Sequence, residues 1–379
     1  MRAGNFLYRC VICYHPPMAQ KVFVGLSGGV DSAVSAALLK EQGHEVTGVF
    51  IRIYRPEFIE CTWKEDRLDA MRVCAALSIP FREIDLSDAY KKEVVDSMIA
   101  DYKAGITPNP DVLCNATIKF GAFLEWALKE GADKIATGHY ALIRTNKPIV
   151  ELLRGKDASK DQSYFLYRLT QKELQHVVFP VGDMLKSEVR QKALELNLPV
   201  ANKHDSQGLC FIGDVSIADF LKRFIDLTPG PVVDTDGNTI GEHEGAALLT
   251  VGQRHGFSLA KNQENVPHYV TTIDASTNTV VVSARKDDAA TKVVAVRNVS
   301  WVNESPQKGQ EVLVQARYRE KPVPATVEPD SERTIVTFAE PHTSPVPNGT
   351  FGRVAAPGQS LVVYTGDVCL GGGVIEKAL

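Results

Sequence analysis

The feature that most constrains this chain is a glycine turn, Ser27-Gly28-Gly29-Val30-Asp31-Ser32, set between two apolar runs. The run before it, 22–26, has the pattern of a strand, and the run after it, 33–39, has that of a helix. A strand, a glycine turn and a helix in this order are typical of a parallel α/β sheet. The backbone N–H groups of such a turn, with the positive end of the helix, attract anions. The turn therefore predicts a phosphate site.

The turn differs from both common phosphate-binding motifs. It lacks the lysine of G-x-x-x-x-G-K-[ST] and the third glycine of G-x-G-x-x-G. Without a lysine, we expect backbone amides, the hydroxyls of Ser27 and Ser32, and a magnesium ion near Asp31 to hold the phosphates. A purely structural alternative is a tight connection in which Ser32 caps the helix and Gly43 ends it.

Composition limits the classes of protein to consider. A chain of 379 residues with 44% hydrophobic residues is expected to form two or three domains with real cores. The net charge is −4 and no polybasic tail occurs, so any contact with nucleic acid must be local. No apolar run approaches the roughly 20 residues that span a bilayer, and no membrane role is expected.

The cysteines and the first residues bear on location. Seven scattered cysteines without a secretory signal favour reduced thiols in the cytoplasm. Residues 1–17 have the pattern of neither a signal peptide nor a transit peptide. We expect them to be a disordered leader or a mis-assigned start, with Met18 as the alternative first residue, and we expect the chain to be a monomer.

Strand and helix patterns alternate through the first half of the chain. The predicted strands are 22–26, 46–51, 81–84 and 134–137, and the predicted helices are 31–42, 65–77, 87–104 and 118–130. This alternation predicts a parallel sheet covered by helices. Ligands of such sheets bind beyond the carboxyl ends of the strands, where both the Ser27–Ser32 turn and Gly138-His139-Tyr140 fall.

The pattern changes after Ile212. Helical periodicity mostly disappears, and runs such as 311–318 and 334–338 alternate or are rich in β-branched residues, which favours a small β-barrel or sandwich. The predicted organisation is an α/β protein with a leader at 1–17, a catalytic parallel-sheet domain at 18–211, a small central β-rich domain at 212–289 and a C-terminal β-barrel at 290–379.

Two cysteines lie in loop-like contexts. Cys114 follows a stretch, 107–113, whose prolines argue against a helix, and Asn115 is predicted to cap the helix that follows. A thiol near a helix N-terminus is favoured as the reactive thiolate. Cys210 lies in a glycine-bounded loop at the end of the first domain and could face the same cleft.

Other interpretations of these cysteines stay open. Each could be an inert, buried small hydrophobe. Asp111, Cys114 and Cys210 could instead offer three ligands to an iron–sulfur cluster, although three dispersed ligands are a weak pattern and our prediction contains no metal site.

Two further segments combine charge with aromatic rings. Residues 160–165 and 317–319 have the composition that can hold phosphate and stack an unpaired base. Each alone is usually a solvated surface. His139 and His255 receive no proton-transfer role in this prediction.

Taken together, the motifs resemble those of one family. The Ser27–Ser32 turn is similar to the pyrophosphate-binding loop of the ATP-pyrophosphatase group. Further segments resemble the bacterial tRNA-specific 2-thiouridylases, from about Gln20 to the C-terminus: 109–114, 138–141, 160–164, 208–213, 252–254, 316–319 and 369–373. The turn is shared with other ligases, whereas both cysteine contexts in this order are specific.

The resemblance implies a reaction. It implies that ATP adenylates the C2 oxygen of the wobble uridine, position 34 of a tRNA, and that pyrophosphate leaves. Cys210 would carry a persulfide received from a sulfur-relay protein or a cysteine desulfurase. Cys114 would be the nucleophile that releases the sulfur, leaving a Cys114–Cys210 disulfide.

The resemblance also implies binding residues. ATP, with Mg²⁺ near Asp31, would be held by Gly25, Leu26, Ser27, Gly28, Gly29, Val30, Asp31, Ser32, Ile51 and Gly138. The target base would contact Asn109, Pro110 and Asp111, and the surrounding tRNA would contact Lys160, Asp161, Gln162, Arg317 and Tyr318. This chain departs from the family where Ile51 replaces the usual methionine and where Ala116 replaces a charged residue.

Two other functions use the same features. An ATP-dependent amide ligase would adenylate a carboxylate with the same turn, but it needs an ammonia source, and no glutaminase-like cysteine context is evident. A non-catalytic RNA or nucleotide binder would use the cysteines structurally. Release of AMP and pyrophosphate only when tRNA is present would exclude the binder.

Overall fold

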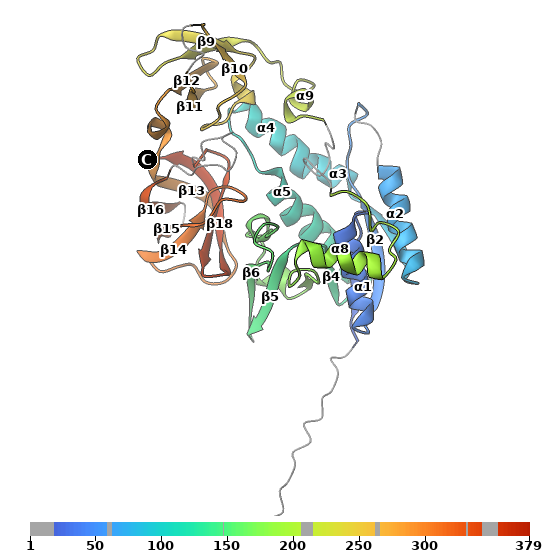
Figure 1. Cartoon of the computed structure of the whole chain (residues 1–379). Helices are drawn as coiled ribbons and strands as arrows, with labels where there is room; N and C mark the ends of the chain where they lie inside the picture. Colours follow the sequence, from blue (N-terminus) through green and yellow to red (C-terminus); the bar gives the residue numbers. More distant parts are fainter. Residues whose placement is uncertain are drawn as a thin grey trace, which may run out of the picture.

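The computed structural model describes residues 19–58, 63–146, 148–205, 215–261, 266–330, 333–342 and 355–379. These residues form a parallel sheet, a small central sheet and a larger C-terminal sheet (Figure 1). Residues 1–17, predicted to be a leader or a mis-assigned start, and Cys210 lie outside the described residues.

The first sheet is parallel and has five strands in the order β3-β2-β1-β4-β7. Its strands are β1 (Lys21–Gly25), β2 (Glu45–Arg52), β3 (Phe81–Asp85), β4 (Lys134–Ala136) and β7 (Val177–Val178). The first four confirm the predicted strands. The two-residue β7 escaped prediction because so short a run has no measurable period.

Helices cover this sheet on both faces. Side chains alternate along β1, so Phe23 packs with Phe120 and Phe123 on one face, whereas Val22 and Val24 pack with the α1 side on the other. The helical elements of this half are α1 (Val30–Glu41), α2 (Trp63–Ala76), α3 (Ser87–Tyr90), the π-helix η1 (Lys91–Asp96), α4 (Ser97–Lys103), α5 (Pro110–Leu113), the π-helix η2 (Cys114–Phe123), α6 (Leu124–Lys129), α7 (Gln171–Leu174) and α8 (Lys186–Glu195). The fold class is confirmed as a helix-covered parallel sheet.

The second half of the chain is mostly β-structure. After α9 (Ile217–Leu221), the central sheet contains β8 (Gly230–Val233), β9 (Thr239–His243), β10 (Phe257–Leu259), β11 (Tyr269–Asp274) and β12 (Thr279–Ser283). The C-terminal strands are β13 (Thr291–Trp301), β14 (Gln310–Gln315), β15 (Val323–Glu328), β16 (Thr334–His342), β17 (Ser360–Thr365) and β18 (Val368–Ala378). Because β13 pairs with both β16 and β18, these strands close on themselves. The predicted C-terminal β-barrel is confirmed.

A hairpin from the first half extends the barrel sheet. Strands β5 (Ala141–Asn146) and β6 (Ile149–Arg154) pair with each other, and β6 pairs with β18 through Leu152 and Leu153. The guanidinium carbon of Arg154 lies 3.9 Å from the centroid of the buried Tyr364 ring. The β5–β6 hairpin therefore belongs to the barrel sheet and not to the parallel sheet, which sequence periodicity did not indicate.

One long helix differs from its prediction. It was expected over 118–130, but α5, η2 and α6 run without a break from Pro110 to Lys129. Pro110 is the first helical residue, where the missing N–H costs nothing.

Within the described residues, no helix has both the length and the apolar character needed to cross a membrane.

Candidate active site

The glycine turn joins β1 to α1 as predicted. Helix α1 begins at Val30 with Gly29 as its N-cap, so the alternative with Ser32 as the cap is wrong. The Ser32 hydroxyl instead lies 3.3 Å from the Ser27 hydroxyl and donates a hydrogen bond to the Gly29 carbonyl at 3.1 Å. Gly43, with φ of +85°, follows the helix end in the left-handed region, as that alternative expected.

Gly28 is required by both backbone and packing. Its φ is +75°, and a Cβ atom there would lie 2.5 Å from the carbonyl oxygen of Asp66. A side chain would therefore be strained in conformation and would also collide with the first turn of α2. Only glycine therefore fits at this position of the turn.

A cavity of about 330 Å³ brings the predicted residues together. One wall is the turn, and an apolar wall contains Ile51, Ile53 and Ile118. The complete lining is Gly25, Leu26, Ser27, Asp31, Ser32, Ile51, Ile53, Cys114, Ile118, Lys119, Thr137, Gly138, His139 and Gln162. Residues predicted separately to hold a nucleotide and to supply a thiol thus share one space, which we call the thiol cavity.

Gly138 also has a packing role. A Cβ atom at this position would lie 2.7 Å from the backbone nitrogen of Ser32. The end of β4 can therefore approach the first turn of α1 only with glycine at this point. Substitution would displace the turn as well as the cavity wall.

A second, polar cavity of about 260 Å³ adjoins the turn and shares Ser27, Asp31 and Gln162 with the thiol cavity. We call this space the basic cavity because four cationic side chains line it: Lys160, Lys186, Lys203 and Arg319. The expectation that no lysine serves the turn is therefore wrong. The fold supplies lysines from distant segments instead of from the motif itself.

Asp31 and Asp205 organise these cations. The Lys186 ammonium lies 2.6 Å from Asp31 Oδ1 and 2.9 Å from Asp205 Oδ1. Lys160 and Arg190 also contact Asp205, at 3.0 and 2.6 Å. Burial raises the pKa of Asp205, but the hydrogen bonds from Lys186 and Lys160 outweigh it, so the pKa lies well below its ordinary value. Asp205 is therefore ionised whenever the protein is folded near neutral pH.

The helix that carries Cys114 begins earlier than predicted. Asn109, not Asn115, is its N-cap and accepts a hydrogen bond from the Val112 amide at 3.4 Å. Cys114 lies one turn inside the helix, with 3% of its surface exposed. Asn115 is buried, and its side-chain amide donates to the Phe165 carbonyl at 3.2 Å.

Cys114 differs from the other described thiols by its surroundings. Burial raises the pKa of Cys74 to about 11 and that of Cys369 to about 12. Neither lines the thiol cavity. These two cysteines fit the interpretation of inert buried residues.

The residues predicted to contact tRNA lie in different surroundings. Lys160, Gln162 and Tyr318 line the basic cavity, and the Tyr318 ring packs against Phe165 with centroids 4.4 Å apart. Asp161 is buried and accepts hydrogen bonds from the backbone N–H groups of Gly155 and Ser163, so it shapes the loop that presents its neighbours. The Arg317 guanidinium donates to the Val251 carbonyl at 3.1 Å.

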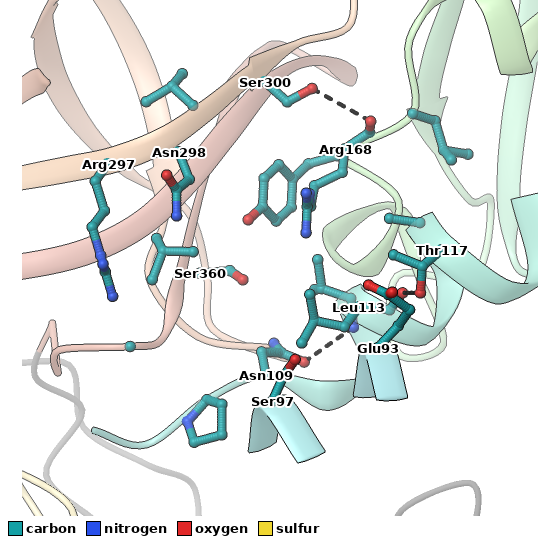
Figure 2. A pocket seen from close by; sticks show the side chains of 18 of the residues that line it. Glu93, Ser97, Asn109, Leu113, Thr117, Arg168, Arg297, Asn298, Ser300 and Ser360 are labelled. Atoms are coloured by element: carbon teal, nitrogen blue, oxygen red, sulfur yellow. Dashed lines mark hydrogen bonds between the residues drawn. The ribbon is translucent and has the colours of Figure 1, made fainter. Parts of the chain in front are cut away.

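A third cavity, of about 770 Å³, lies on the barrel side of the long helix (Figure 2). Asn109, Leu113 and Thr117 line it from the helix, and Arg297 lines it from β13. Cys114 belongs to the thiol cavity and not to this one. Asn109, the predicted base contact, and Cys114, the predicted nucleophile, therefore lie on the same long helix but line different cavities.

Sequence reasoning missed several residues of the site. Lys186 is 155 residues from Asp31 along the chain, so no local sequence pattern could predict their ion pair. The Tyr140 hydroxyl donates to Asp31 Oδ1 at 2.8 Å, and the position of Tyr140 after β4 was the available signal. Lys119 was also missed, because its place on the cavity depends on the shape of η2.

The side chains that the structure describes include no group of three or more His, Cys, Asp and Glu residues that could hold a metal ion. Cys210, one of the three ligands considered for a cluster, lies outside them.

Comparison with known proteins matches the chain along most of its length. Family models described as a tRNA methyl transferase HUP domain, a tRNA methyl transferase PRC-barrel domain and an aminomethyltransferase beta-barrel domain match residues 20–214, 218–284 and 291–375. A relative from Paraburkholderia phymatum, named tRNA-specific 2-thiouridylase MnmA, is 41% identical and covers 95% of this chain and 94% of its own. A relative of the same name from Serratia proteamaculans is 42% identical and covers 95% and 98%.

Solved structures match more weakly. The U34-tRNA thiolase NcsA from Methanococcus maripaludis, with its [4Fe-4S] cluster, is 19% identical and covers 54% of this chain and 62% of its own, with a TM-score of 0.34. Similarity at this level says nothing about ligands or chemistry.

Proposed function

The chain belongs to the tRNA-specific 2-thiouridylase family, and from that membership we propose how its residues insert sulfur at C2 of a uridine in tRNA. The observation that carries the proposal is the thiol cavity, which the phosphate turn and Cys114 line together. A reaction that needs a nucleotide and a thiol in one place is sulfur transfer to an ATP-activated base.

ATP binds across the two adjoining cavities. Its adenine lies against the apolar wall of Ile51 and Ile53, and its β- and γ-phosphates lie at the turn, beside the lysines of the basic cavity. The C2 oxygen of the wobble uridine attacks the α-phosphorus, and the bond from the α-phosphorus to the bridging oxygen breaks. Groups that hold the leaving pyrophosphate stabilise that step, because its negative charge grows there.

Magnesium fits at Asp31 as a companion of the phosphates. Lys186 and Tyr140 contact the Oδ1 atom of Asp31, and this carboxylate would contact an ion held mainly by phosphate oxygens. The ion would supply positive charge to the phosphates.

Sulfur transfer uses Cys114 and Cys210. Cys210 carries a persulfide, and its terminal sulfur attacks C2 of the activated base and displaces AMP. The thiolate of Cys114 then attacks the Cys210 sulfur. The sulfur–sulfur bond breaks, its electron pair leaves with the thiouridine, and a Cys114–Cys210 disulfide remains to be reduced by an external thiol.

The tRNA is proposed to approach over the basic cavity. Lys160 and Gln162, which line that cavity, hold the backbone near the target together with Arg317, the residue before Tyr318. The Tyr318 ring offers a surface on which an unpaired base stacks. Asn109, Pro110 and Asp111 contact the base that is turned out of the anticodon loop. A persulfide donor of the sulfur-relay or cysteine-desulfurase class charges Cys210. We place the protein in the cytoplasm, as a monomer.

Methyl transfer, the activity named in two family-model descriptions, fits the site less well. The usual methyl donor, S-adenosylmethionine, has no phosphate groups, whereas this site has a glycine turn and four lining cations. The names of the relatives agree with thiolation instead.

The test is a thiolation assay. Protein, ATP, magnesium, a persulfide donor and unmodified tRNA are mixed, and 2-thiouridine, AMP and pyrophosphate are quantified. We expect Cys114→Ser and Cys210→Ser to abolish 2-thiouridine, while Cys369→Ser, a matched change at a buried cysteine outside the cavity, retains it. Full turnover by both of the first two variants would refute their roles.

A further inference from the structure

The helical segment that contains Cys114 is wound as a π-helix. In η2, Cys114–Phe123, hydrogen bonds join residues five apart, so residues i and i+5 stand on successive turns of the same face. In an α-helix, the neighbours on one face are three or four residues apart. Lys119 follows Cys114 by five residues, and both line the thiol cavity. The π-winding therefore puts an ammonium group and the proposed nucleophile on one face.

The other titratable groups around this cavity supply no comparable positive charge. Burial lowers the pKa of His139 well below its ordinary value, and the charge of Lys119 lowers it further, so the ring is neutral. Asp31 is an anion and is paired with Lys186. Among the described residues that line the thiol cavity, Lys119 is the cation.

Titratable groups near Cys114 that do not line the cavity also supply no positive charge. Tyr90 and Tyr102 lie in the same buried cluster as Cys114, and burial raises the pKa of Tyr102 to about 12, so its phenol is neutral. Burial raises the pKa of Asp111, and the Lys119 charge opposes that rise. The charge of Lys119 thus acts on His139, which lines the thiol cavity with Cys114, and on Asp111, three residues before Cys114 in the same long helix.

We propose that Lys119 is a further catalytic residue, whose ammonium stabilises the Cys114 thiolate that releases the sulfur. The inference rests on the proposed role of Cys114 as the nucleophile. A positive charge beside a cysteine favours the thiolate, and the burial of Cys114 limits the screening of that charge at the sulfur. The proton of the Cys114 thiol leaves to solvent through the cavity. The thiolate then attacks the Cys210 sulfur, and the thiouridine leaves with the electron pair of the broken sulfur–sulfur bond.

The test measures the thiol itself as well as turnover. Iodoacetamide alkylation of the Cys114 peptide is followed by mass spectrometry from pH 5.5 to 9.5, in the full chain carrying Cys210→Ser to prevent disulfide formation. Lys119→Met removes the charge at similar volume, Lys119→Arg keeps it, and Lys129→Met changes an exposed lysine on the same helix. The Cys74 and Cys369 peptides report any loss of folding.

We expect Lys119→Met to slow alkylation of Cys114 at pH 7 about tenfold and to move its pH midpoint upward, with Cys74 and Cys369 unchanged. Lys119→Arg stays within about threefold, and Lys129→Met has no effect. The same alkaline shift appears in single-turnover thiolation with Cys210 intact.

An unchanged alkylation rate and pH midpoint in Lys119→Met would overturn the inference. If the KM for ATP rose at the same time, Lys119 would be assigned to the phosphates. This result leaves the proposed function intact as long as Cys114→Ser is inactive, whereas an active Cys114→Ser would remove the proposed function itself.

Discussion

The ammonium of Lys186 lies 2.6 Å from the carboxylate oxygen Oδ1 of Asp31, although 155 residues separate the two along the chain. Asp31 belongs to the first turn of α1, and Lys186 is the first residue of α8. The glycine turn thus acquires from another helix the lysine that its motif lacks.

Lys186→Met should weaken ATP use. The substitution removes a charge from the basic cavity and leaves Asp31 without its ion pair, and a charged hydrogen bond is worth about 1.5–3 kcal/mol. We expect the KM for ATP to rise about tenfold or more in the thiolation assay. The control is Lys192→Met, which changes another lysine of α8 and removes only its surface ion pair with Glu41 of α1. Equal effects of the two changes would contradict the assignment.

Gly28→Ala should destabilise the protein more than Gly43→Ala. Both glycines have positive φ, so both substitutions cost about 1–2 kcal/mol of backbone strain. Only at Gly28 does the new Cβ meet a neighbour, the Asp66 carbonyl, whereas nothing lies within 4 Å at Gly43. The additional cost is about 1–3 kcal/mol. Urea unfolding of the two variants measures the difference, and equal midpoints would show that the first turn of α2 simply moves aside.

The contribution of Asp205 to stability should depend on pH. Its folded pKa is depressed, so its stabilising effect is complete above the pKa of an unfolded aspartate, about 3.9, and is lost as the pH falls toward the folded pKa. Asp205→Asn should therefore destabilise the protein at pH 7 and have progressively less effect below about pH 4. Denaturant unfolding of both proteins from pH 7 to pH 3 tests this. If the difference in unfolding free energy between the two proteins stayed constant over that pH range, the ion pairs of Asp205 could not be its source.

Tyr318→Ala should weaken tRNA binding. Stacking of a base on an aromatic ring is worth about 1–3 kcal/mol, which corresponds to roughly 5- to 150-fold in affinity. Tyr318→Phe keeps the ring and should change binding less than about threefold. Filter binding of unmodified tRNA distinguishes them. If Tyr318→Ala binds as tightly as the parent, the ring serves only to pack against Phe165.

Local signals sufficed for the parallel sheet. Runs of apolar residues marked the four longer strands, and Gly43, Gly105 and Gly131 marked helix ends, where each has a positive φ. The prediction that residues 107–113 are not helical was wrong at its end, because Pro110 starts a helix instead of preventing one. The start of this helix is set by the cap, one hydrogen bond to the Asn109 side chain, and not by composition.

Tertiary relations could not be predicted from spacing. The phosphate turn and Cys114 were both found in the sequence, but their shared cavity depends on packing of η2 against β1 and β4. Lys186 and Lys119 had no local motif. A π-winding depends on how the helix packs, so the residue that shares a face with Cys114 cannot be read from an α-helical repeat.

The hairpin β5–β6 has a consequence for biosynthesis. Ribosomes release the chain from its N-terminus, so the hairpin emerges long before β18, the strand that β6 pairs with in the finished molecule. Until then β6 exposes an unpaired backbone edge, the kind of surface that recruits strands from other chains. A nascent chain stalled before residue 368 should thus need chaperone protection although its parallel sheet is complete, and truncated products that lack β18 should accumulate in inclusion bodies.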